Sequence, residues 1–283
     1  MTDSRTASAA TADWLGVCQR AAAKLGEILA ATTETADRVA EVGSTGEGGD
    51  RTLVIDAQAE DAVFEELDKL HSEGYRFSAI SEERGEVNYG DPSIRVVVDP
   101  IDGSMNAKRG LRHHSISIAV AAGETMEDVF FGFVYDFGPS EEWVAELGKG
   151  ATLNGEPLVG PGTERRTDDG KLELVGIESA NPLWVGDASS DLAEVCYRLR
   201  AVGSIAITMC QVAAGRLDAM LSIKPCRSVD AAAAQLIVRE SGGVVAFPAA
   251  ATPLGAPLDL APNSSVVAAR TAAGVAEATR ATR

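Results

Sequence analysis

The stretch Val98-Asp99-Pro100-Ile101-Asp102-Gly103-Ser104-Met105-Asn106 decides how this chain is interpreted. An apolar run leads into two carboxylates three positions apart, and Gly and Ser then stand where a helix would start. Carboxylate oxygens suit a hard divalent cation, and the backbone N–H groups of Gly103 and Ser104 would face an anion. The stretch therefore predicts a phosphate bridged to a metal. Read alone it also fits an Asx-turn followed by a helix cap, because Asp-Pro and Asp-Gly are ordinary turn dipeptides.

Four other acidic positions gain meaning only in combination. Glu82 and Glu83 follow the apolar run 77–80, and adjacent acids usually form a solvated face. Asp230 precedes an alanine-rich segment and Asp56 opens a second apolar-periodic segment, so each is first interpreted as a helix N-cap. No single one of these acids indicates a site.

Hydrophobic periodicity predicts the elements of the first half of the chain. We expect a long helix over 9–42 ending in a glycine cluster at 43–49, then a short apolar run at 52–55 and a helix over 56–70. The expected strands that follow lie at 95–98, 115–120, 129–135 and 142–147, the last two forming a hairpin. Strands thus come in runs rather than in alternation with helices.

A second set of strands and helices begins after a turn-rich, polar stretch at 153–170. We expect strands at 172–177 and 219–223 and helices at 188–197, 205–214 and 229–241, the last closed by Gly242-Gly243. The chain is therefore predicted to have two parts, 1–160 and 161–283. The first would carry most metal ligands, and the second would complete the metal site and the substrate pocket.

Composition excludes several classes of partner. The 283 residues contain 25 Lys and Arg against 42 Asp and Glu, a formal charge of −17. Such a charge argues against nucleic acid and against an anionic membrane surface. The four scattered cysteines lack zinc-binding spacing, no apolar stretch is long enough for a membrane helix, and the N-terminus does not resemble a signal peptide. We expect a cytoplasmic protein that must bring cations to any phosphorylated substrate.

In combination, these segments resemble the lithium-sensitive sugar and inositol phosphatases, the family of inositol monophosphatase and fructose-1,6-bisphosphatase. The likeness covers nearly the whole chain and is greatest to the archaeal type with both activities. It rests on 52–60, Glu82-Glu83, 99–106, 148–155, 200–205 and 212–230. The resemblance implies a mixed α/β (α+β) fold, a layered αβαβα sandwich of the sugar-phosphatase type, and a homodimer.

The resemblance also implies a metal site. One Mg²⁺ would be held by Glu82, Asp99 and the carbonyl of Ile101, and a second by Asp99, Asp102 and Asp230, with Mn²⁺ as a possible substitute. A third, weaker ion would lie near Glu82 and Asp56. Two carboxylates 4 Å apart repel by about 4 kcal/mol at an effective dielectric constant of 20, so such a cluster needs cations. A metal-bound water oriented by Glu82 and by Ser104, itself paired with Asp56, would attack phosphorus in line.

The substrate side of the pocket follows from the same resemblance. Asp102, Gly103 and Ser104 would contact the phosphate ester. Arg200, Lys224 and Arg227, with the backbone of Gly203, Ser204 and Ile205, would line the sugar or polyol. The fork of donors of an Arg suits a second phosphate. From the residues alone, Lys224 and Arg227 are equally well explained as solvated surface cations.

Three departures from the family pattern bear on the metals and the substrate. The loop 43–50 has no counterpart of the Lys found in the animal inositol phosphatases. Gly48 stands where the archaeal loop has an Asp, which argues against a third metal. No Glu stands near 222–223, where the animal enzymes hold inositol hydroxyls. The expected function is Mg²⁺-dependent hydrolysis of myo-inositol 1-phosphate, fructose 1,6-bisphosphate or both. The alternatives are a 3′-phosphoadenosine 5′-phosphate or NADP phosphatase and, in another class, a catalytically silent binding or regulatory protein.

Overall fold

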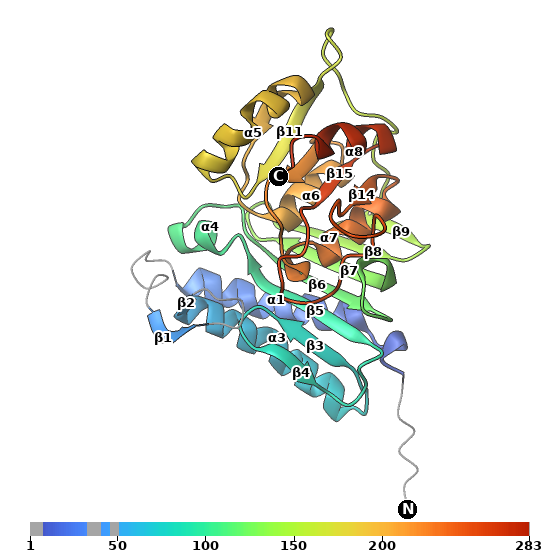
Figure 1. The fold of residues 1–283 in the computed structure, drawn as a ribbon. Helices are drawn as coiled ribbons and strands as arrows, with labels where there is room; N and C mark the ends of the chain where they lie inside the picture. The colour runs from blue at the N-terminus through green and yellow to red at the C-terminus, as the bar shows by residue number, and fades with distance from the viewer. Residues whose placement is uncertain (1–7, 33–40, 46–50, 283) are drawn as a thin grey trace, which may run out of the picture.

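The computed structural model describes residues 8–32, 41–45 and 51–282, which form two sheets and three layers of helices (Figure 1). The first sheet has eight strands in the order β10-β9-β8-β7-β6-β5-β3-β4, and only β3 and β5 pair in parallel. Its strands are β3 (Ser78–Ser81), β4 (Gly85–Asn88), β5 (Arg95–Asp102), β6 (Ser115–Ala121), β7 (Val129–Asp136), β8 (Glu141–Glu146), β9 (Gly150–Leu153) and β10 (Glu156–Leu158).

The second sheet has five strands in the order β12-β11-β13-β15-β14. Strand β11 pairs in parallel with both neighbours, whereas β15 pairs antiparallel with both of its own. The strands are β11 (Leu172–Glu178), β12 (Cys196–Arg200), β13 (Ala219–Ser222), β14 (Val244–Ala246) and β15 (Val267–Ala269). A separate antiparallel ribbon joins β1 (Glu41–Thr45) to β2 (Arg51–Leu53).

Three hydrophobic clusters show how the layers are stacked. Helices α1 (Trp14–Ala31) and α3 (Val54–Ser72) bury their apolar faces on one face of the first sheet. Helices α6 (Ile205–Ala213) and α7 (Ser228–Glu240) lie between the two sheets and share one cluster with both. Helices α5 (Pro182–Val195) and α8 (Ala272–Thr279) cover the outer face of the second sheet. The expected αβαβα sandwich is confirmed.

The middle layer fits because its residues are small. The alanines 231–234 of α7 are buried, and a Cβ added to Gly132 of β7 would lie 2.6 Å from the backbone oxygen of Ala233. A helix of alanines against a strand glycine lets two backbones approach where larger side chains would clash. This close approach packs the middle of α7 against β7 of the first sheet.

Several predicted boundaries were wrong. The first helix ends at Ala31, not at 42, and 41–45 form strand β1; the predictions for 33–40 and for the glycines at 46–49 lie outside the described residues. Helix α3 begins at Val54, so Asp56 lies in its first turn and is not its N-cap. Helix α5 runs over 182–195 because Asn181 caps its start, and Cys196 already begins β12.

Short elements were also missed. The sequence predicted no strands at β3, β4, β9, β10, β12, β14 or β15 and no helix α8. The 3₁₀ turns η1 (Ala9–Thr11) and η2 (Met126–Asp128) and the one-and-a-half-turn helix α4 (Ser104–Arg109) complete the elements of the described residues. Helix α4 begins where the sequence placed a helix start.

The division into 1–160 and 161–283 stays a prediction. The first sheet ends at Leu158 and the second begins at Leu172, while helices of the second half pack on both.

The cysteines Cys18, Cys196, Cys210 and Cys226 are free and buried. No helix in the described part of the chain is both long enough and apolar enough to cross a membrane.

Candidate active site

Strand β5 carries both carboxylates of the deciding stretch, and an irregularity brings them into range of each other. In a regular strand, positions three apart point to opposite faces. Here the pairing of β5 with β6 shifts register between Asp99 and Asp102, where Pro100 has no N–H to donate. Both carboxylates are buried, and the charge of Asp102 raises the pKa of Asp99. The shift explains how acids three apart contribute to one site.

The end of β5 also supports the ordinary interpretation of Asp99. Its Oδ1 accepts a hydrogen bond from the N–H of Ile101 at 3.0 Å, which is the local turn that the dipeptide alone predicted. Gly103 follows with φ +84° and begins α4, and a Cβ there would lie 2.7 Å from the carbonyl oxygen of His113. Only glycine fits this left-handed and crowded position. Turn and candidate site therefore coexist in one segment.

Asp102 is held from across the molecule. Its Oδ2 accepts hydrogen bonds from Ser204 Oγ at 2.5 Å and from the N–H of Ala206 at 2.7 Å, both at the start of α6. Burial raises the pKa of Asp102 to about 7, although these hydrogen bonds lower it. The first sheet and α6 are thus joined at this carboxylate.

Glu82 and Asp230 meet on either side of Arg227. Arg227 Nη1 lies 2.8 Å from Glu82 Oε1, and Arg227 Nη2 lies 3.8 Å from Asp230 Oδ1. Asp230 also accepts the backbone N–H of Arg227 at 3.0 Å, but Arg227 is the N-cap of α7 and Asp230 is its third residue, so the prediction of Asp230 as the N-cap is wrong. Burial raises the pKa of Glu82 to about 7 against the opposing charge of Arg227.

Four carboxylates therefore influence one another around one guanidinium. Burial, and then the charges of Glu82, Asp102 and Asp230, raise the pKa of Asp99 well above its usual range, and Arg227 opposes them. Among the described residues, however, no three His, Cys, Asp or Glu side chains are close enough to hold one ion as they stand. The guanidinium of Arg227 lies between Glu82 and Asp230.

The chemistry of this donor set suits a hard divalent cation, because it consists of the oxygen ligands that Mg²⁺ prefers. Burial raises the pKa values of Glu82, Asp99 and Asp102, so negative charge is costly there without a bound cation. Glu82, Asp99, Asp102, Asp230 and the carbonyl of Ile101 remain the predicted ligands.

Ser104 is the first residue of α4, and its pairing with Asp56 stays a prediction. Asp56 is buried, and its Oδ2 lies 3.4 Å from Lys108 Nζ, a partner that the sequence analysis did not anticipate. Lys108 stands one helical turn after Ser104, so the i, i+4 spacing was the available signal.

The predicted substrate residues divide into two groups. Gly203, Ser204 and Ile205 lie at the start of α6 and close to α4. A Cβ added to Gly103, just before α4, would lie 3.1 Å from the carbonyl oxygen of Gly203. Arg200 is exposed on the edge strand β12, where its guanidinium bonds the carbonyl of Leu199, and Lys224 lies over the ring of Trp184 in α5. Arg227 alone of these cations contacts the acids in the described structure.

Glu178 was missed by the sequence analysis. This buried carboxylate accepts hydrogen bonds from the N–H groups of Val202 and Gly203 and from Thr208 Oγ1 at 2.6 Å. Burial raises its pKa to about 7, and its charge raises the pKa of Asp102. No local motif marks it; the only signal is an acid at the end of an apolar strand.

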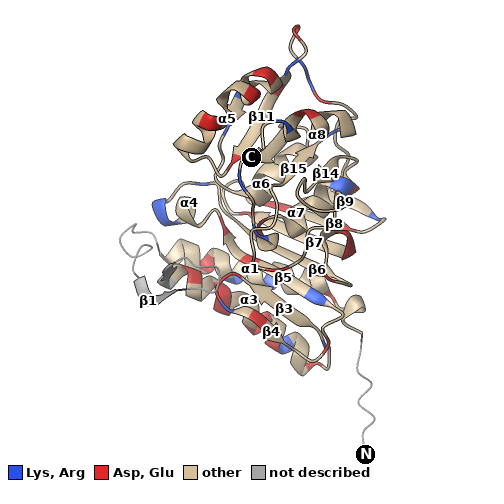
Figure 2. Cartoon of the chain, in the orientation of Figure 1, with Lys and Arg blue, Asp and Glu red and all other residues tan. Residues whose placement is uncertain are grey.

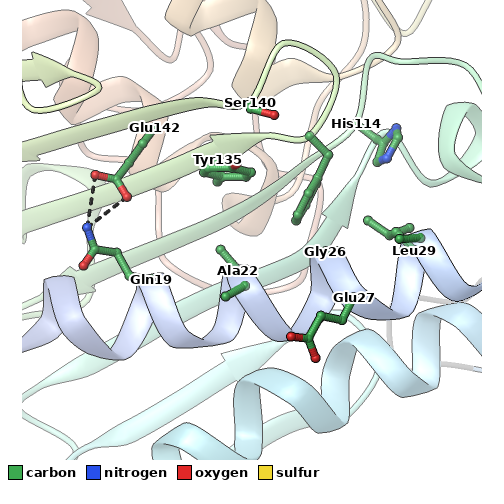
Figure 3. A pocket seen from close by; sticks show the side chains of 12 residues that line it. Gln19, Ala22, Gly26, Glu27, Leu29, His114, Tyr135, Ser140 and Glu142 are labelled. Atoms are coloured by element: carbon green, nitrogen blue, oxygen red, sulfur yellow. Dashed lines mark hydrogen bonds between the residues drawn. The ribbon is translucent and has the colours of Figure 1, made fainter.

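Two surface features lie apart from these acids. A cleft of about 620 Å³ between α1 and strands β7 and β8 is lined by Gly26, Tyr135, Glu142 and neighbours, and by none of the predicted site residues (Figure 3). Figure 2 shows acidic residues along the outer helices α3 and α5, while α4 carries basic ones in its last turn. The remaining negative charge of the chain is thus largely on its surface.

The sequence matches the inositol monophosphatase family over residues 11–283. The chain belongs to this family. It is 33% identical over 246 residues to the fructose-1,6-bisphosphatase/inositol-1-monophosphatase of Methanothermobacter thermautotrophicus, covering 82% of this chain and 83% of the relative. It is also 33% identical over 234 residues to the Nus factor SuhB of Escherichia coli, covering 82% and 84%. The resemblance expected from the motifs is confirmed.

Solved structures show the same fold. An inositol monophosphatase–fructose 1,6-bisphosphatase superimposes with a TM-score of 0.78 at 24% identity, over 95% of this chain and all of the other. The extragenic suppressor protein SuhB of Bartonella henselae gives a TM-score of 0.76 at 23% identity, over 96% and 99%. The family and its curated relatives support a sugar phosphatase.

Proposed function

We propose that this inositol monophosphatase family member is a Mg²⁺-dependent phosphomonoesterase acting on small sugar or polyol phosphates, with myo-inositol 1-phosphate and fructose 1,6-bisphosphate as the leading substrates. The observation that carries the proposal is a set of interacting acids in which Asp99 and Asp102 are buried and Glu82 and Asp230 are half-buried, the first three from the first half of the chain and Asp230 from the second. So much buried negative charge calls for cations, and its substrate would be an anion.

The proposed ligands are Glu82, Asp99, Asp102, Asp230 and the carbonyl of Ile101. Bound there, Mg²⁺ or Mn²⁺ would supply the positive charge that favours water as a nucleophile and stabilises the leaving oxygen. Glu82 would orient the attacking water from beside the metal. Ser104 would orient that water, with Asp56 and Lys108 fixing the start of α4 around it.

The substrate would lie against the starts of α4 and α6. Asp102 would accept a hydrogen bond from a substrate hydroxyl. The backbone at Gly203 to Ile205 lies close by, because Ser204 donates to Asp102 and Gly203 packs against Gly103. Arg227 would contact a second phosphate, and Lys224 and Arg200 would lie farther out. A homodimeric assembly and a cytoplasmic location remain predictions of the same proposal.

The test is phosphate release from a panel of substrates, with Mg²⁺ or with EDTA. The panel contains myo-inositol 1-phosphate, fructose 1,6-bisphosphate, 3′-phosphoadenosine 5′-phosphate and NADP. We expect Mg²⁺-dependent turnover of one or both of the first two. Preference for either nucleotide would favour the second phosphatase class. No turnover of any member would favour a regulatory protein, the class to which the SuhB relative named a Nus factor points.

A further inference from the structure

The guanidinium of Arg227 is the positive group at the centre of the acid set. It bridges Glu82 at 2.8 Å and Asp230 at 3.8 Å, and its side chain is 21% exposed. The backbone N–H of Arg227 also donates to Asp230 Oδ2, so the start of α7 holds the two residues together. Glu82 stands at the end of β3, far away in sequence. The contact between Arg227 and Glu82 therefore ties α7 to the first sheet.

Arg227 is strongly retained as a cation. Burial on its own lowers the pKa of Arg227, but the carboxylates of Asp230, Glu82 and Asp99 outweigh it and hold that pKa above the ordinary value. In turn, Arg227 opposes the mutual repulsion that acts on Asp99. A positive charge in this position already does part of what a metal ion would do there.

A guanidinium and a divalent cation cannot both use this place. Mg²⁺ requires its oxygen ligands at about 2.0–2.1 Å in a nearly octahedral arrangement, and like charges at such separations repel. The Glu82 oxygen that faces Arg227 at 2.8 Å would have to change partner. Entry of the ion therefore demands that Arg227 move away.

We propose that Arg227 is an internal counter-ion that neutralises the acid set before metal binds and competes with the metal for Glu82 and Asp230. This inference rests on the proposed function, because it takes the acid set as the metal site. The net free energy of metal binding is then the interaction of the ion with the acids less the interaction with Arg227 that the acids must give up. Removing Arg227 tightens metal binding, whereas a simple substrate-binding role leaves it unchanged.

Release also gives Arg227 its second use. Once freed from Glu82, its planar fork of donors is available to a phosphate, and it lies in the same loop as Lys224. The metal and the second phosphate of a bisphosphate therefore bind with positive coupling. A monophosphate lacks this coupling because it leaves the released guanidinium without a partner.

The experiment is calorimetric titration of the substrate-free full-length protein with MgCl₂ and, separately, MnCl₂. Arg227→Gln is compared with wild type and with Arg216→Gln, which removes the same charge from the exposed ion pair with Glu141. We expect Arg227→Gln to bind metal about tenfold more tightly, a typical size for coupling between two ligands. Arg216→Gln should match wild type.

Arg227→Lys covers the case in which the Gln variant does not fold. A lysine keeps the charge but cannot bridge both acids, so metal affinity between wild type and tenfold tighter is expected. Unchanged or weaker metal binding in the Arg227 variants overturns this inference alone. Absence of divalent-cation binding by the wild type overturns the proposed function itself.

Discussion

At the scale of single residues, the candidate site depends on partners far apart in sequence. Asp102 is held by Ser204 and Ala206, and Glu82 by Arg227. The sequence predicted which acids belong to the site because their types and order resemble a family motif. It could not predict these partners, since nothing local in a chain specifies which loop will face a strand end.

Glu178 gives a prediction at this scale. Its carboxylate accepts hydrogen bonds from three donors, and Glu178→Gln replaces one of its two acceptor oxygens with an NH₂ group in a buried place surrounded by donors. We expect a loss of about 1–3 kcal/mol in the free energy of unfolding, measured with urea. Glu173→Gln, an exposed position on the same strand, is the matched control and should cost little. Equal losses in the two variants would contradict the assigned role of Glu178.

At the scale of elements, the deciding stretch was interpreted correctly as a strand leading into a helix start, while the first helix was drawn too long. The sequence after Ala31 has threonines at 32, 33 and 35, which are poor helix formers, and 41–45 pair instead with β2. Periodicity continued through this region and concealed the end of the helix. Short strands such as β9 and β12 carry too few residues for an alternating pattern to be recognised.

The two ends of α4 give a matched pair of glycines for a test. Gly103 and Gly110 both have positive φ, but a Cβ at Gly103 would meet the carbonyl oxygens of His113 and Gly203, whereas at Gly110 nothing lies within 4 Å. We expect Gly110→Ala to cost about 1–2 kcal/mol of stability from backbone strain and to retain most activity. Gly103→Ala should cost more and should also lower kcat, because it displaces the start of α4 from that of α6. Similar stability and kcat in both variants would contradict this account of the close approach.

At the scale of the whole molecule, the middle layer explains why the site spans both halves of the chain. Helices α6 and α7 pack against both sheets, and they carry the groups that hold Asp102 and the predicted ligand Asp230. The sequence indicated this layering only through resemblance, because periodicity identifies a buried helix but not the two sheets that enclose it. The same layering brings together acids whose pKa values are raised by burial, among them Glu82, Asp102 and Glu178.

That concentration predicts how stability depends on pH. Burial raises the pKa values of Glu82, Asp102 and Glu178 to about 7 in the folded protein. The folded state therefore binds protons more tightly than the unfolded state. The resulting stabilisation is complete below the ordinary carboxyl pKa values of about 4 and is lost as pH rises through about 7.

The measurement is thermal unfolding with EDTA between about pH 5 and pH 8. We expect the Tm to fall over this range, and MgCl₂ at the upper end to restore more of it than NaCl of equal ionic strength, which only screens charge. A Tm that is constant or rises with pH in EDTA would contradict the interpretation of these acids.

The central claim is that acids from both halves of the chain form one metal-dependent phosphatase site. Its most direct test is phosphate release from fructose 1,6-bisphosphate and myo-inositol 1-phosphate as a function of Mg²⁺ concentration, for wild type, Asp102→Asn and Asp230→Asn. We expect Mg²⁺-dependent turnover by the wild type and a loss of about a hundredfold or more in kcat/KM for each variant, since each removes a charge used in the transition state. Variants that retain most of the wild-type activity, or turnover that persists in EDTA, would contradict it.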